Sequence, residues 1–109
     1  MEPDEIVGIL GSRPGVSSVL IADQGGAILG HAGDTDPEAL AAAAVFVVSC
    51  VTRLGDSLAL GDPLYVLAAS AHRRLAFVQG TAGLAAMELS GPAVASGACH
   101  EALALLHGR

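Results

Sequence analysis

The pattern of apolar and polar residues along the chain predicts three helices and five strands. Apolar residues at helical spacing and capping signals mark the helices, whereas short apolar runs between glycine-containing turns mark the strands. Residues 82–89 fit a strand or a helix by pattern alone, and their length and the short turn before them favour a strand. In chain order the predicted elements are a helix over 4–10, strands over 16–22 and 27–32, a helix over 37–54, strands over 64–70, 74–79 and 82–89, and a helix from Gly91-Pro92 to about His107. This order, α-β-β-α-β-β-β-α, predicts an α+β fold in which helices cover the faces of a five-stranded antiparallel sheet.

The long central helix has a well-marked predicted start. Thr35 and Glu38 have the spacing of a capping box, but that motif would make Asp36 helical, and a residue before proline avoids the helical region. We therefore expect Asp36 at the N-cap and Pro37 at the first helical position. Gly55 is expected to close the helix.

This helix is apolar on nearly all sides. At about 100° per residue, several apolar residues fall on one face of the helix, and this face is expected to pack on the sheet. The opposite side also consists mostly of Ala, Val and Phe, so a single sheet leaves part of the helix uncovered. A second chain or the loop over 55–62 must cover the remainder, and an interface with another chain is favoured. The residues expected to face the sheet are Leu40, Ala43, Val47, Cys50, Val51 and Leu54.

The run Leu64-Tyr65-Val66-Leu67-Ala68-Ala69 is apolar on both faces of its predicted strand. One interpretation is a central strand that is buried on both sides. The other is an edge strand that pairs with its own copy across a two-fold axis, since an exposed apolar edge otherwise promotes aggregation.

Composition narrows the class of protein. The 109 residues are expected to form a single domain over 1–109, and they are 52% hydrophobic but only 3% aromatic. Small side chains bury little area each, so further burial between chains is expected. The formal net charge of −6, with five Arg and no Lys, argues against nucleic acid as a partner.

The sequence also predicts where the protein acts. The N-terminus is acidic rather than basic, which is unlike a secretory signal peptide. The longest apolar run, 39–48, is shorter than the roughly 20 residues that span a bilayer. The two cysteines form no CxxC motif, as is typical of reduced thiols. We therefore expect a cytoplasmic protein without membrane insertion.

The reactive side chains form no recognisable catalytic pattern. Cys50 and Cys99 lack the cationic neighbours that lower a thiol pKa, so both are expected in the core. His100 and His107 lack the further ligands of a zinc site. Gly25–Gly30 lies in a strand–turn–strand pattern, which favours turn geometry over nucleotide binding. No catalytic residue, metal site or cofactor is therefore predicted.

The segment His72-Arg73-Arg74 is the only cationic cluster. It falls on a predicted hairpin turn, where side chains are usually solvated. Contact with an acidic or phosphate-bearing partner is the alternative interpretation.

Two motifs point to a known family. Pro14-Gly-Val with Asp23-x-x-Gly26, and the helix start Asp36-Pro37-Glu38-x-Leu40, together with the order of the elements, resemble the roadblock / dynein light-chain family over nearly the whole chain. The resemblance implies a homodimer in which the long helices pair and the third strands join two sheets. It also implies function, because bacterial and archaeal members regulate or scaffold small Ras-like GTPases, and eukaryotic members serve as adaptor subunits.

On this basis the predicted function is that of a non-catalytic homodimeric adaptor or regulator that binds a small Ras-like GTPase. A small-ligand sensing module or a purely structural scaffold of profilin-like fold is the alternative. The predicted dimer interface comprises Ala41, Ala44, Val45, Val48 and Thr52 of the helix and Leu64, Tyr65, Val66, Leu67 and Ala68 of the strand. The predicted partner contact comprises Glu38, Ala42, Phe46, Ser49 and Arg53.

Overall fold

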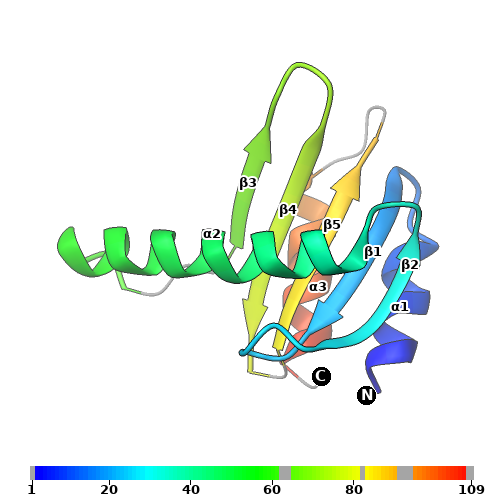
Figure 1. The fold of residues 1–109 in the computed structure, drawn as a ribbon, viewed down its shortest axis with the longest axis horizontal. Coiled ribbons are helices and arrows are strands. Elements are labelled where there is room, and N and C mark those ends of the chain that lie inside the picture. Colours follow the sequence, from blue (N-terminus) through cyan, green and yellow to red (C-terminus); the bar gives the residue numbers. More distant parts are fainter. Residues whose placement is uncertain (1, 62–64, 82, 91–94, 108–109) are drawn as a thin grey trace.

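The computed structural model describes residues 2–61, 65–81, 83–90 and 95–107, and it confirms the predicted order of elements. All strand pairs are antiparallel, and the strands lie in the order β2-β1-β5-β4-β3 (Figure 1). The predicted starts of the 64–70 strand and of the last helix, at Leu64 and at Gly91-Pro92, lie outside the described residues. The elements are α1 (Pro3–Gly11), β1 (Val16–Ala22), β2 (Ile28–Gly33), α2 (Pro37–Ser57), β3 (Tyr65–Ala69), β4 (Arg74–Gly80), β5 (Gly83–Leu89) and α3 (Ala95–Leu106).

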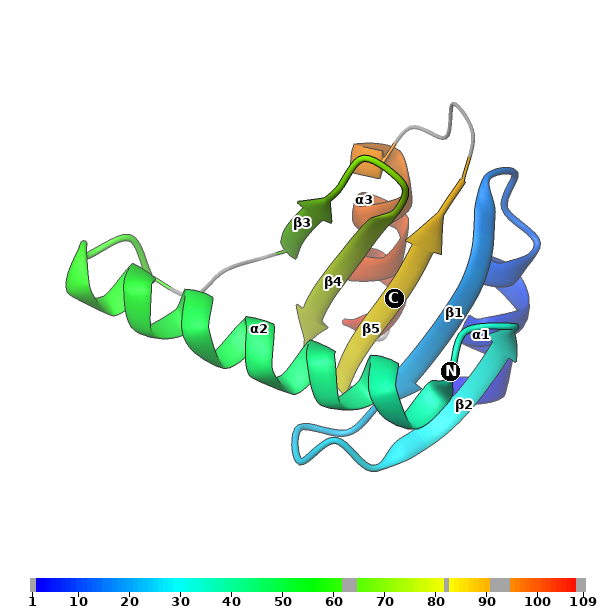
Figure 2. The same cartoon turned by 45° about the horizontal axis from the view of Figure 1, so that its top comes forward.

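The sheet separates two apolar cores. Helices α1 and α3 cover one face, and α2 crosses the other (Figures 1 and 2). Side chains alternate between the faces along each strand, so Val19 and Ile21 of β1 pack toward α1 and α3, whereas Leu20 packs toward α2. The central strands β1, β5 and β4 are buried on both faces, which explains their nearly continuous apolar runs.

The start of α2 is as predicted. The Oδ1 atom of Asp36 accepts a hydrogen bond from the backbone N–H of Glu38 at 3.1 Å, and Pro37 is the first helical residue. Thr35 does not form a capping box, because its hydroxyl donates to the Glu88 carboxylate instead, with 2.6 Å between the oxygens.

The end of α2 differs from the prediction. Gly55 does not close the helix, which continues to Ser57 with Leu58 as its C-cap. The following loop folds back on the helix, and the backbone N–H of Leu60 donates to the Gly55 carbonyl at 2.8 Å. A Cβ atom at Gly55 would lie 2.5 Å from the carbonyl oxygen of Gly61. The glycine therefore allows a close approach of the loop rather than a change of backbone direction.

The face of α2 that packs on the sheet matches the prediction only in part, since Ala43 and Val47 are half-buried against the same apolar cluster as Leu40. Leu40, Ala41, Ala44 and Val48 are buried against the sheet, and of these only Leu40 was expected there. Because the helix is apolar on nearly all sides, its periodicity did not distinguish the face that the sheet covers. Cys50 is exposed and Leu54 is 58% exposed, so the prediction that both lie in the core is wrong.

The two edges of the sheet are not equivalent. β3 is an edge strand rather than a central one, and its residues pair with β4 in an unbroken register; the expected pairing with a second copy stays a prediction. On the opposite edge, the register between β1 and β2 shifts so that Leu29 has no partner in β1. Such a bulge discourages pairing with another chain, and among the described residues of the two edge strands it occurs in β2 and not in β3.

Candidate protein-binding site

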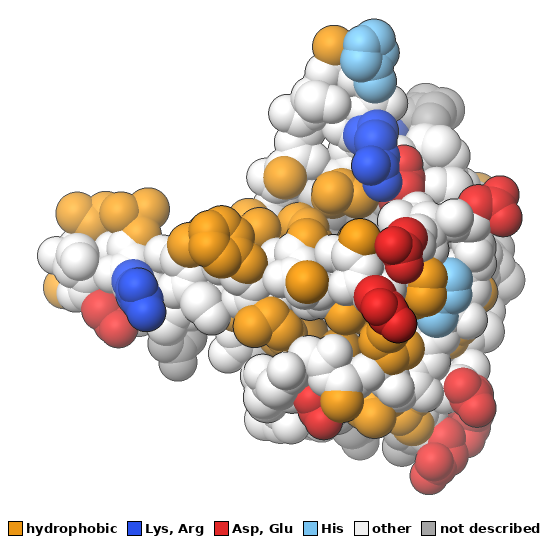
Figure 3. All heavy atoms as spheres, viewed as in Figure 1, with side chains coloured by type: hydrophobic (Ala, Val, Ile, Leu, Met, Phe, Trp, Pro, Cys, Tyr) orange, Lys and Arg blue, Asp and Glu red, His pale blue; other side chains and the backbone are white. Residues whose placement is uncertain are grey.

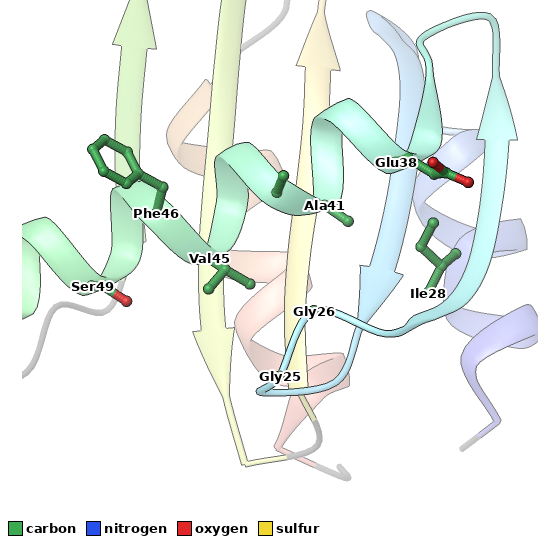
Figure 4. A pocket seen from close by; sticks show the side chains of 9 residues that line it. Gly25, Gly26, Ile28, Glu38, Ala41, Val45, Phe46 and Ser49 are labelled. Atoms are coloured by element: carbon green, nitrogen blue, oxygen red, sulfur yellow. The ribbon is translucent and has the colours of Figure 1, made fainter.

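A groove with a volume of about 540 Å³ lies between α2 and the hairpin that joins β1 to β2 (Figure 4). Its lining is mainly apolar, and Glu38 and Ser49 supply its only charged and hydroxyl side chains. Val45 and Ser49 point toward the side of α2 on which the hairpin lies, whereas Phe46 points away from it. The groove is lined by Gly25, Gly26, Ile28, Glu38, Ala41, Ala42, Val45, Phe46 and Ser49.

The residues of the β1–β2 turn allow the hairpin to lie close to α2. The Oδ1 atom of Asp23 accepts hydrogen bonds from the backbone N–H groups of Gly25 and Ala27, both at 2.9 Å. Gly26 has a φ of +93°, and a Cβ atom there would lie 3.1 Å from a methyl group of Val45. Glycine at this position thus permits both the turn and its approach to α2.

A second cavity of about 330 Å³ continues along the same side of α2. It shares Val45 and Ser49 with the first groove and adds Thr52 and Arg53 from the helix and Gln24 from the hairpin. The structure therefore brings the predicted contact residues together along one side of α2, with four of them in the first groove and Arg53 in the second cavity. The sequence analysis did not identify Gly25, Gly26 or Ile28 as part of this site, because a turn motif does not reveal which helix it approaches.

The predicted dimer interface needs correction. Ala41, Ala44 and Val48 pack on the sheet of their own chain, with exposed fractions of 3%, 1% and 8%, so assigning them to an interface between chains is wrong. The other predicted interface residues in the described part of the chain are half-buried or exposed, namely Val45, Thr52, Tyr65, Val66, Leu67 and Ala68. Leu64 lies outside the described residues.

A large apolar surface lies at the free end of α2. The helix extends past β3 and projects beyond the edge of the sheet (Figures 1 and 2). Figure 3 shows apolar side chains both over the sheet and on the projecting part. Phe46 is 70% exposed, and the projecting end carries Leu54, Leu58 and Leu60 with exposed fractions of 58%, 59% and 74%. Several large apolar side chains exposed on one element are typical of an interaction site.

Helix α2 also has the length and the hydropathy of a helix that could span a membrane. With 21 residues and a mean hydropathy of 1.6, α2 is long and apolar enough to cross a membrane by length and composition alone. Core helices of soluble proteins pass the same test, and α2 packs on the sheet along part of its length.

A polar network joins the start of α2 to the hairpin between β3 and β4. The Glu88 carboxylate accepts hydrogen bonds from the Arg73 guanidinium at 2.9 and 2.8 Å and from the Thr35 hydroxyl at 2.6 Å. The Thr35 hydroxyl also lies 3.0 Å from the hydroxyl of the buried Ser18. Arg73 is exposed as expected for this turn, but it also forms an ion pair with Glu88. The sequence analysis missed Glu88 because its partners are distant in the chain.

These contacts change the acid–base properties of the pair. Hydrogen bonds from Arg73 and Thr35 lower the pKa of Glu88, and the hydrogen bond to Glu88 raises the pKa of Arg73. A carboxylate whose pKa is lower in the folded state stabilises the fold above its unfolded pKa, and this stabilisation is lost as the pH falls through the folded pKa.

We therefore expect Glu88→Gln to lower the free energy of unfolding modestly at pH 7, because the pair is partly exposed and solvent screens it. The difference from wild type should shrink toward pH 3, where the unfolded-state carboxyl is protonated. Urea unfolding of the wild type and of Glu88→Gln at pH 7 and pH 3 measures this difference in the free energy of unfolding. An unchanged difference between the two pH values would contradict this assignment.

Cys99 and His100 lie in different environments, Cys99 in the core and His100 at the surface. Cys99 is buried as predicted, and its burial raises the pKa of the thiol. His100 is exposed and packs edge-on against Tyr65, with 5.8 Å between the ring centroids. Within the described residues, no three His, Cys, Asp or Glu side chains lie close enough together to hold a metal ion.

Comparisons with known proteins show which fold the chain has. No family model and no curated protein matches the sequence. Among solved structures, a Roadblock/LC7 domain from Streptomyces avermitilis superposes with a TM-score of 0.82 at 22% identity, covering 97% of this chain and 92% of that chain. MglB from Myxococcus xanthus gives 0.75 at 13% identity, covering 94% and 80%, and an MglB with a tetrameric arrangement gives 0.80 at 15% identity, covering 94% and 82%. The chain therefore has the roadblock fold that its sequence resembles.

Proposed function

We propose that this chain is a non-catalytic, cytoplasmic adaptor or regulator that forms a homodimer and binds a small Ras-like GTPase. The observation that carries the proposal is the distribution of exposed apolar surface on α2. Part of this surface projects beyond the edge of the sheet, and part lines a groove beside the β1–β2 hairpin. The family resemblance supplies the class of partner.

The homodimer uses the β3 edge and the projecting end of α2. β3 has the regular pairing that a second strand can extend, whereas β2 carries a bulge. Leu67 of β3 is 49% exposed, and Leu54, Leu58 and Leu60 lie on the projecting helix end and its loop. A two-fold axis at β3 covers both surfaces at once, since an isologous interface presents the same patch from each chain.

The GTPase contacts the exposed surface of α2, through Glu38, Ala42, Phe46 and Ser49, with Arg53 at the far end. The first groove has few polar groups, because Glu38 supplies the one carboxylate and Ser49 the one hydroxyl among its lining side chains. Its one carboxylate and one hydroxyl do not form a nucleophile with an adjacent base, which is consistent with a binding role rather than catalysis.

An affinity capture with matched variants tests this function. The tagged protein is incubated with lysate of its native cells in the presence of GTP or GDP, and the captured proteins are identified by mass spectrometry. We expect a Ras-like GTPase that is enriched in one nucleotide state, and a loss of at least about tenfold with Ala42→Arg. Ala104→Arg, an equally exposed alanine on α3, serves as the control.

The captured GTPase is then purified and titrated against both variants in each nucleotide state. Absence of a Ras-like GTPase in both states would contradict the proposed function. Equal binding of Ala42→Arg and wild type would contradict the proposed contact surface.

A further inference from the structure

The first groove and the second cavity form one continuous trough between α2 and the β1–β2 turn. Val45 and Ser49 line both of them, and the turn lines both as well, through Gly25 and Gly26 in the groove and Gln24 in the cavity. We call this combined space the α2 trough. Its cavity end adds six residues to the lining of the first groove, namely Gln24, Val48, Thr52, Arg53, Gln79 and Leu84.

Hydrogen bonds fix the wall of the trough that the turn provides. The Oδ1 atom of Asp23 holds the backbone N–H groups of Gly25 and Ala27. The Nε2 atom of Gln24 donates to the carbonyl oxygen of Gly80 at 3.1 Å, which ties the turn to the end of β4. A trough whose walls are already in place loses little conformational freedom when a ligand binds.

The two ends of the α2 trough carry opposite charges. Glu38 lines the groove end, and Arg53, the only cationic residue of α2, lines the cavity end. Asp56 lies one turn after Arg53 but forms no ion pair with it. Among the residues that the structure describes, neither Glu38 nor Arg53 has an ion-pair partner. Both charges are therefore available to groups of opposite sign on a ligand.

Several hydrogen-bond donors surround Arg53 at the cavity end. Gln79 contributes a half-buried carboxamide, and Ser49 and Thr52 contribute hydroxyls. Within the described part of the chain, these side chains form no hydrogen bonds of their own. Guanidinium, amide and hydroxyl groups all donate to a carboxylate, and arginine binds one through two parallel N–H groups. The cavity end therefore suits an acidic side chain.

We infer that an extended segment of a protein partner lies in the α2 trough, with an acidic side chain at Arg53 and a basic side chain at Glu38. The two charges are 15 residues apart on the helix (53 − 38), which is about 22 Å along its axis. An extended chain rises about 3.3 Å per residue, so the two charged residues of the segment are about six or seven positions apart.

Apolar side chains of the segment lie between its two charges, where Ile28 and Val45 line the groove (Figure 4). A site of this length, with one charge at each end, fits an extended peptide better than a small metabolite. The trough shares Glu38, Ser49 and Arg53 with the proposed GTPase contact. The inference therefore rests on the proposed function, and it names the kind of segment that the partner contributes.

Selection from a random peptide library tests this charge pattern. The purified full chain is immobilised and used to select from phage-displayed random peptides of about twelve residues. With wild type we expect selected peptides to carry Lys or Arg at one position and Asp or Glu six or seven positions away, with apolar residues between. An extended peptide can lie in the trough in either direction, so both orders of the two charges are expected.

Charge reversal at either end should change which peptides are selected. Arg53→Glu makes both ends of the trough acidic and should select basic residues at both positions. Glu38→Arg makes both ends basic and should select acidic residues at both. A synthetic peptide with the wild-type consensus should bind each of these variants at least about fivefold more weakly than wild type. Glu5→Arg, an exposed charge reversal on α1, is the control and should select the wild-type pattern.

A wild-type selection without an enriched pattern would overturn the inference, as would the wild-type pattern in both trough variants. Enrichment of apolar peptides without the two charges would also overturn it, because the trough would then bind an apolar surface. The selection contains no GTPase, so it is independent of the affinity capture. Capture of a GTPase without a charged peptide pattern overturns this inference alone, and the pattern without a captured GTPase overturns the proposed function alone.

Discussion

Replacing Val48 with Asp is expected to unfold the chain rather than to separate an oligomer. Val48 is 8% exposed and belongs to the apolar cluster between α2 and the sheet, together with Phe77 and Leu84. An unpaired carboxylate at such a site costs about 3–5 kcal/mol. A domain of this size is stable by only about 5–15 kcal/mol, so a large share of its stability would be lost, and all of it at the lower end of this range.

Urea unfolding followed by circular dichroism measures this loss. Phe46→Asp is the matched control, because Phe46 lies two residues earlier and is 70% exposed. The control should unfold at nearly the same urea concentration as wild type. A Val48→Asp protein whose free energy of unfolding stays within 1 kcal/mol of wild type would show that α2 does not pack on the sheet through this face.

Replacing Leu54 with Glu is expected to abolish the homodimer and leave the fold intact. Leu54 is 58% exposed on the projecting end of α2, so its replacement costs the isolated chain little. In an isologous dimer each substitution occurs twice, and each places a charge in an apolar contact. We expect dimerisation to weaken at least about 100-fold, which corresponds to about 2.7 kcal/mol.

Sedimentation velocity at micromolar concentration gives the mass of the assembly. Leu29→Glu is the control, since Leu29 is a similarly exposed leucine on the opposite edge of the sheet. It should remain a dimer. A dimeric Leu54→Glu together with a monomeric Leu29→Glu would place the interface at β2.

Most of the local structure was predictable because it depends on neighbouring residues. The β1–β2 turn requires glycine and an Asx carboxylate within a few residues, and both are visible in the segment 23–26. The start of α2 depends on Asp36 and Pro37 alone. The order of the elements, and with it the roadblock resemblance, follows from signals of this kind.

The sequence by itself determined that α2 is an apolar helix with too much apolar surface for one sheet to cover. Only the tertiary structure decided which face is buried, because a helix that is apolar on nearly all sides fits the sheet in several rotations. It also placed Glu88 beside Arg73 and Thr35, and the hairpin beside Val45, since these contacts join segments far apart in the chain. Such contacts depend on how the layers stack, and the spacing of residues along one element carries no information about that stacking.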